Sequence, residues 1–157
     1  MIQISGNNSP YTDSHTDALI FAANNRLEKY YIDDFLKKND YLITQRFWLD
    51  FFIYHLNKEY SIEKLAKLLN PKDLPIPDII LFLKCNPKTG YYRIKDSKGD
   101  KFEKEELMKS HTKNYEKIIE QIRHNNFIVK MPKTKIITIQ TDKEIVNVKL
   151  EVKKILK

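Results

Sequence analysis

The sequence predicts an α/β domain with a small, mostly parallel sheet. Residues 79–83 form a continuous apolar run between polar flanks, as expected for a strand that is buried on both faces. The runs of strand length are separated by segments with helical spacing, an order typical of layered α/β domains. A chain of 157 residues with 41% apolar residues fits one domain. We therefore expect a single domain over 1–157, with the polar residues 1–13 as a flexible arm.

The N-terminal half should contain three helices and one strand. Apolar residues recur every three or four positions up to Leu36, and an aromatic-rich stretch follows Gln45 and Arg46. Asn70-Pro71 ends the last of these helices. The expected order is a helix up to 36 with Ser14 or Thr16 as its cap, a strand at 41–44, an aromatic helix at 47–57 and a short helix that Ser61 begins.

The C-terminal half is expected to alternate in the same way. After the strand at 79–83, Pro87 begins a helix through Arg93, and a long amphipathic helix runs from Lys104. Residues 127–131 and 135–139 have the composition of strands, and a hairpin between them is one option. The last segment, 142–156, fits either a helix or a strand, because its apolar residues satisfy both periods.

Composition limits the classes of function. The 28 Lys and Arg residues exceed the 21 Asp and Glu residues, and the net charge of +7 favours phosphate-bearing partners. Acidic residues lie between the lysines, so a nucleic-acid surface is the less favoured interpretation. The single cysteine, Cys85, excludes an internal disulfide and a cysteine metal cluster. No apolar run is long enough to span a membrane, and no signal peptide is visible, so we expect a cytoplasmic protein.

Arg46 is the first candidate ligand for an anion. It follows the predicted strand at 41–44, and the carboxyl ends of strands border the ligand crevice of an open α/β sheet. His111 lies on the apolar face of the long helix. A lone histidine in that position is more often a hydrogen-bonded core residue than a ligand.

Six segments in a fixed order resemble thymidylate kinases of the P-loop nucleoside-monophosphate kinase fold. They cover the chain from about Thr16 onward and are Leu19 to Asn24, Gln45-Arg46-Phe47, Tyr54-His55, Pro75 to Asp78, Pro87 to Ile94, and Asp100 to Glu103. The resemblance implies a three-layer, P-loop-kinase-like sandwich. It also implies that Phe21 stacks on a base, that Arg46 and Tyr54 hold a nucleoside monophosphate, and that Arg93, Lys95 and Lys98 lie on the lid side near ATP phosphates.

The departures from the family pattern concern the transfer chemistry. The sequence contains no Gly-x-x-x-x-Gly-Lys-Ser/Thr motif, and its three glycines allow no relaxed version. The family's first strand, P-loop, first helix and second strand would precede Met1, so we expect a truncated fold. Gln45 replaces the family's Asp, and an amide neither carries the charge nor acts as a base. Arg26 follows Phe21 by five residues instead of four, so we do not expect it on the substrate phosphate.

Three functions are consistent with these features. The preferred one is a degenerate, non-catalytic relative that binds or assembles and retains a dTMP-type half-site, with no catalytic residue, metal ligand or cofactor. The alternative is a thymidylate kinase that converts ATP and dTMP to ADP and dTDP, with Mg²⁺, and that is completed by a separate P-loop chain or by an upstream segment. The third is a basic nucleic-acid-binding module, whose affinity would fall steeply with salt.

The expected gap in the sheet predicts a partner. Removal of a central strand leaves apolar edges, which attract other chains unless they are covered. We therefore expect the strands at 41–44 and 79–83 either to pair directly or to be bridged by another chain. The partner would be a second copy of this chain or a different chain that covers the open sheet.

Overall fold

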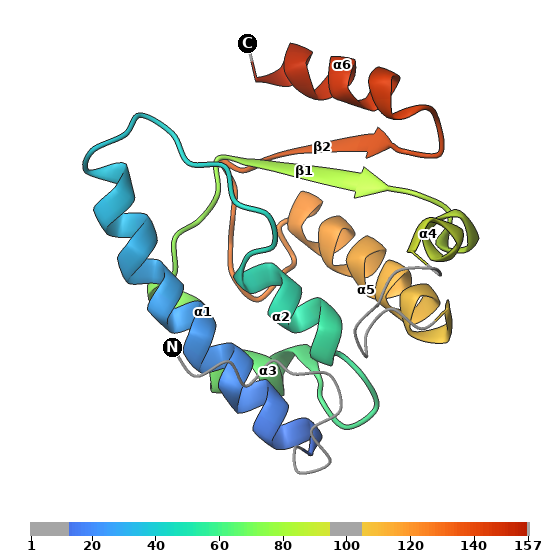
Figure 1. Cartoon of the computed structure of the whole chain (residues 1–157). Coiled ribbons are helices and arrows are strands. Elements are labelled where there is room, and N and C mark those ends of the chain that lie inside the picture. The colour runs from blue at the N-terminus through green and yellow to red at the C-terminus, as the bar shows by residue number, and fades with distance from the viewer. Residues whose placement is uncertain (1–12, 95–104, 157) are drawn as a thin grey trace.

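The structure, a computed structural model, describes residues 13–94 and 105–156. It is a mixed helix and strand fold with a small parallel sheet, which confirms the predicted class (Figure 1). The elements are α1 (Ser14–Leu36), α2 (Trp48–His55), α3 (Ile62–Leu69), the 3-10 turn η1 (Pro71–Asp73), β1 (Ile79–Lys84), α4 (Pro87–Ile94), α5 (Glu105–Arg123), β2 (Lys135–Gln140) and α6 (Ile145–Ile155).

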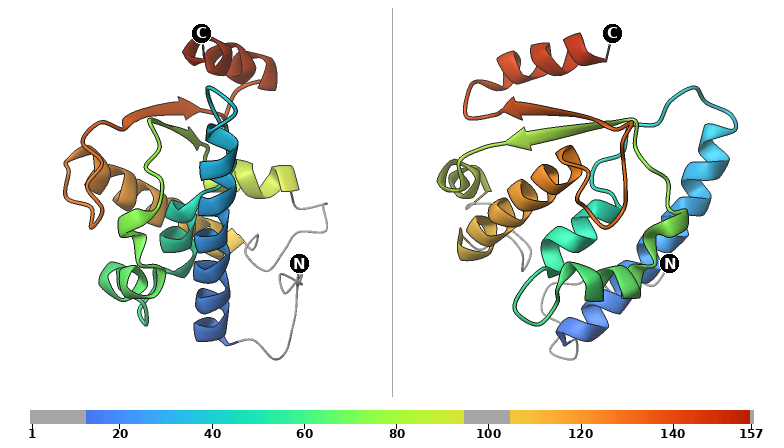
Figure 2. Two further views of the ribbon diagram at one scale, coloured as in Figure 1. Left: turned by 90° about the vertical axis from the view of Figure 1, so that its left-hand side faces the viewer. Right: turned by 180° about the vertical axis from the view of Figure 1, so that it is seen from behind.

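The sheet lies between two helical layers. β1 and β2 run parallel, with Ile79 beside Lys135 and Lys84 beside Gln140. On one face, Phe82 stacks on Tyr115 of α5 with ring centroids 5.8 Å apart. On the other face α6 covers β2, so the sheet separates α6 from the remaining helices (Figure 2). This is the expected three-layer arrangement.

The main core lies between the helices and is centred on α2. This helix packs against α1, α3 and α5, so its apolar residues are buried on nearly every side. The largest fully buried side chains are Trp48, Phe51, Phe52, Leu65, Leu69, Ile118 and Phe127.

The predicted strand at 41–44 is wrong. Within the described residues the sheet contains β1 and β2 only, and 41–44 is an irregular segment in which Tyr41 is 76% and Ile43 66% exposed. An extended segment becomes a strand only when a neighbour pairs with its backbone. The expected direct pairing of 41–44 with 79–83 is therefore also wrong. The side chains of Tyr41 and Ile43 remain exposed to solvent.

The strand and hairpin predicted from 127–131 are wrong as well. The chain leaves α5 through Asn125, which adopts a left-handed φ of 52°, and the Phe127 backbone N–H donates to the Gln121 carbonyl. Phe127 and Met131 are buried in the helical core, so their apolar character comes from loop packing. β2 follows this loop and pairs in parallel with β1.

The remaining expectations concern helix ends and the last segment. Residues 145–155 form a helix, which resolves the ambiguity over 142–156. Ser61 caps α3 as predicted. The predicted cap of α1, Ser14 or Thr16, is wrong: the cap is Asp13, whose carboxylate accepts from the Thr16 N–H at 2.7 Å. No helix in the described part of the chain is long and apolar enough to cross a membrane.

Candidate functional site around Arg46

Arg46 lies in a strained turn directly before α2. Its φ of 63° is in the left-handed region, which a residue with a side chain adopts only where the surroundings fix it. The Thr44 hydroxyl donates to the Arg46 carbonyl at 3.1 Å, and the Phe47 N–H donates to the Asp50 carboxylate at 2.8 Å. Bonds on both sides therefore hold this turn and direct Arg46 toward α2.

The Arg46 guanidinium lies over the ring of Tyr54, 5.2 Å from its centroid. The rings of Tyr54 and His111 of α5 meet edge-on, with their centroids 4.8 Å apart. His111 is buried, as predicted. Among the described residues, no carboxylate forms an ion pair with Arg46. A guanidinium presents several planar donors that match a phosphate, so Arg46 suits an anionic ligand.

Phe21 contacts the same helix from α1. It is half-buried, and its ring meets that of His55 edge-on at 5.1 Å. His55 follows Tyr54 directly and is buried, with Nδ1 2.9 Å from the Phe51 carbonyl. The structure thus brings Arg46 and Tyr54 into contact and places Phe21 against the residue next to Tyr54.

Sequence reasoning missed an acidic group beside this site. Asp50 and Tyr54 lie four residues apart on α2, and the Tyr115 hydroxyl donates to the Asp50 carboxylate from α5. The pKa of Tyr115 is raised, mainly by burial and to a lesser extent by the negative charge of Asp50. The hydroxyl therefore stays protonated and remains a donor. The apolar spacing of α5 includes Tyr115, but the pairing depends on how α2 and α5 pack.

Glu28 is a second acidic residue that the sequence did not single out. It is half-buried on α1, and the Asn24 amide donates to it at 3.2 Å. Burial raises the pKa of Glu28, the Asn24 hydrogen bond lowers it, and the Asp50 charge raises it further; the net shift is upward.

We expect Glu28→Gln to raise the melting temperature relative to wild type more at pH 7 than at pH 4. Because the folded-state pKa lies above the unfolded value, the folded chain binds more protons, and stability falls as pH rises through these values. Thermal melts at several pH values measure this. Glu63→Gln is the control of opposite sign, because the Ser61 hydrogen bond lowers the pKa of Glu63. An equal effect of Glu28→Gln at both pH values would contradict the prediction.

Of the lid-side residues, Arg93 lies at the carboxyl end of the sheet. Its guanidinium donates to the Thr141 carbonyl at 2.8 Å, in the loop between β2 and α6. In the same loop the Asp142 carboxylate accepts from the Asn86 N–H at 3.0 Å. Lys95 and Lys98, like residues 100–103, lie outside the described residues.

Arg26 is committed to a structural ion pair. Its guanidinium binds both carboxylate oxygens of Asp73, at 2.5 and 2.9 Å, and the Asn70 carbonyl at 2.8 Å. The Arg26 hydrogen bond lowers the pKa of Asp73. Arg26 therefore connects α1 to the end of α3, consistent with its displaced position in the sequence.

The residues that the structure describes do not fit a magnesium ion. Gln45, which precedes Arg46, is exposed and offers an amide where a carboxylate would hold the metal. Within 13–94 and 105–156, no three His, Cys, Asp or Glu side chains are arranged to bind an ion.

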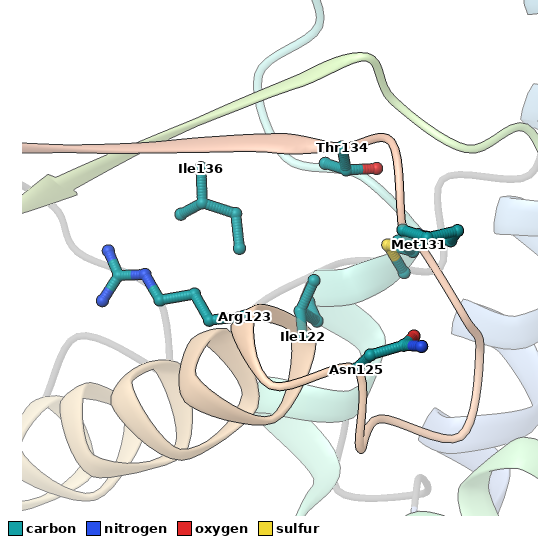
Figure 3. A pocket seen from close by; sticks show the side chains of 7 residues that line it. Ile122, Arg123, Asn125, Met131, Thr134 and Ile136 are labelled. Carbon is teal, nitrogen blue, oxygen red and sulfur yellow. The ribbon is translucent and has the colours of Figure 1, made fainter.

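A cavity of about 330 Å³ lies away from these residues, where the chain passes from α5 to β2 (Figure 3). The Arg123 guanidinium beside it is engaged by Glu120 at 2.5 Å and Thr138 at 2.7 Å. Of the residues predicted to bind a ligand, none that the structure describes lines this cavity. Its lining consists of Ile122, Arg123, Asn125, Met131, Pro132, Thr134 and Ile136.

Comparison with known proteins supports the resemblance seen in the sequence. The family model described as thymidylate kinase matches residues 3–149. No curated protein and no solved structure matches the chain. Because the family match covers well over half of its length, the chain belongs to the thymidylate kinase family.

Proposed function

We propose that this chain binds a nucleoside monophosphate of the dTMP type and does not transfer a phosphoryl group by itself. The observation that carries the proposal is the strained Arg46 turn, which holds a guanidinium over Tyr54. Strain of this kind persists where the surrounding structure supports it and is common at ligand sites. Phe21 supplies an aromatic face for the base, and Arg46 supplies the donors for the phosphate.

The absence of transfer follows from the groups that phosphoryl transfer needs. Catalysis requires backbone amides and a lysine around the ATP phosphates, together with ligands for Mg²⁺. This sequence has no Gly-x-x-x-x-Gly-Lys-Ser/Thr motif, and Gln45 cannot act as a base. Binding without turnover is the function that these residues support.

Calorimetric titration with dTMP tests the binding site. We expect Arg46→Ala to weaken dTMP binding by about ten- to a hundredfold, the equivalent of roughly 1.5–3 kcal/mol for a charge-assisted hydrogen bond. Thymidine, which lacks the phosphate, should bind wild type and the Arg46→Ala variant with equal affinity. Arg123→Ala is the matched control, because this arginine is engaged by Glu120 and Thr138. Equal dTMP affinity of the Arg46 and Arg123 variants would refute the site.

A coupled assay with dTMP, ATP and Mg²⁺ separates binding from catalysis. We expect dTMP binding without formation of ADP by the purified chain. Turnover that disappears with Arg46→Ala would establish the alternative function, a thymidylate kinase, and would overturn the non-catalytic part of the proposal. The binding titration would still test the substrate site on its own.

A further inference from the structure

The outer edge of β1 carries a row of backbone groups that face away from β2. The Asp78 carbonyl accepts from the Lys135 N–H at 2.8 Å, and the Lys84 carbonyl accepts from the Thr141 N–H at 2.7 Å. Backbone groups alternate between the two edges of a strand, so the even-numbered residues face β2. Ile79, Leu81 and Leu83 therefore direct N–H and C=O groups to the outer edge, where the described residues provide no further strand.

The side chains of these three residues share one face of the sheet. Successive side chains alternate, so this face is opposite to Phe82, which stacks on Tyr115 of α5. It is the face on which α6 lies, but α6 packs against β2. Ile79 is 43% and Leu83 is 53% exposed, although strands of parallel sheets are normally buried on both faces. An apolar strand with an open edge favours pairing with another strand.

We propose that this edge pairs with β1 of a second copy of the chain. The two strands run antiparallel around a two-fold axis at Leu81 and form a continuous sheet in the order β2, β1, β1, β2. A two-fold contact brings the same surface from both copies together, so the strand must complement its own reverse.

The sequence of β1 meets this condition. With the axis at Leu81, Leu81 faces its own copy and Ile79 faces the second copy's Leu83, so every contact on this face is apolar. Each of these pairs exchanges both N–H···O bonds, because all three residues direct their backbone groups outward. The exposed Ile79 of each copy is thus covered by the second copy's Leu83, and the exposed Leu83 by the second copy's Ile79.

Charge selects this register. The axis at Leu81 places Asp78 directly opposite the second copy's Lys84, at both ends of the paired strands. Lys84 is already oriented by Glu116 of α5, with Nζ 2.6 Å from the carboxylate. Opposite charges at facing positions stabilise a strand pair, and a shift of the register by two residues would lose both contacts.

Sedimentation velocity over a concentration series tests the pairing. We expect a reversible dimer and, for Leu83→Lys, a dimer dissociation constant raised at least about tenfold, because lysine on a strand edge opposes pairing. Leu27→Lys is the matched control: Leu27 is 58% exposed but lies on α1. Its dissociation constant should equal that of wild type. No residue proposed to bind dTMP is altered, so this result is independent of the nucleotide titration.

A charge exchange tests the register. Asp78→Lys alone places two lysines opposite each other, and Lys84→Glu alone places two acids opposite each other, so each variant should be monomeric. An equimolar mixture should recover the dimer. Circular dichroism checks that each variant is folded. Hydrogen exchange tests the pairing in wild type without a mutation, because the Leu81 amide should exchange more slowly as the protein concentration rises. A monomeric wild type, Leu81 exchange that is independent of concentration, or equal effects of Leu83→Lys and Leu27→Lys would overturn the proposal.

Discussion

Phe52→Ala is expected to lower the free energy of unfolding by about 3–5 kcal/mol. The Phe52 side chain is fully buried in α2, and its ring meets those of Trp48, Phe51 and Phe127 at centroid distances of 6.2, 5.7 and 5.3 Å. These neighbours come from α2 and from the loop after α5. Because each of them is itself held by other core residues, the surroundings cannot close over the space that the ring leaves.

Urea denaturation followed by tryptophan fluorescence and circular dichroism measures this loss. Phe35→Ala is the control: Phe35 lies on α1 and is 42% exposed, so its replacement should cost less than about 1 kcal/mol. Similar losses for the two variants would mean that the helical core is not centred on α2. A change in the slope with urea would instead indicate an altered unfolded or native state.

The sequence predicts the helices well because their signals are local. The spacing of Leu107, His111, Tyr115, Ile118 and Ile122 identifies α5, and the Ser61 hydroxyl caps α3 by accepting from the Lys64 N–H at 3.3 Å. β1 is also recognisable, since it combines a continuous apolar run with the preceding prolines. These features depend on residues within a few positions of each other.

Strands require a partner that the local sequence does not reveal. Residues 41–44 and 127–131 have the composition of strands, yet neither pairs, and Phe127 and Met131 enter the core from a loop. The site shows the same limit. The resemblance pointed to Arg46 and Tyr54, which are in contact, but no local pattern predicts the left-handed φ of Arg46 or the hydrogen bond from Tyr115 to Asp50. The hydrogen bond from Tyr115 to Asp50 depends on the packing of α2 against α5.

Asp50→Ala should lower the free energy of unfolding by about 2–3 kcal/mol, because two partly buried hydrogen bonds to a charged group are lost and their donors are left without an acceptor. The carboxylate accepts from the Phe47 N–H at the start of α2 and from the Tyr115 hydroxyl of α5. It therefore connects the turn that carries Arg46 to the helix that carries His111. Tyr115→Phe removes only the second of these bonds.

A double-mutant cycle with Asp50→Ala and Tyr115→Phe separates the two contributions. If the hydroxyl and the carboxylate interact directly, the double variant should lose less stability than the sum of the single variants, by about 1–2 kcal/mol. The residual loss from Asp50→Ala in the Tyr115→Phe background then measures the bond to the Phe47 N–H. Asp50→Asn, which keeps an acceptor for that N–H, should lose less than Asp50→Ala. Additive losses in the cycle would show that Tyr115 does not stabilise the Arg46 turn through Asp50.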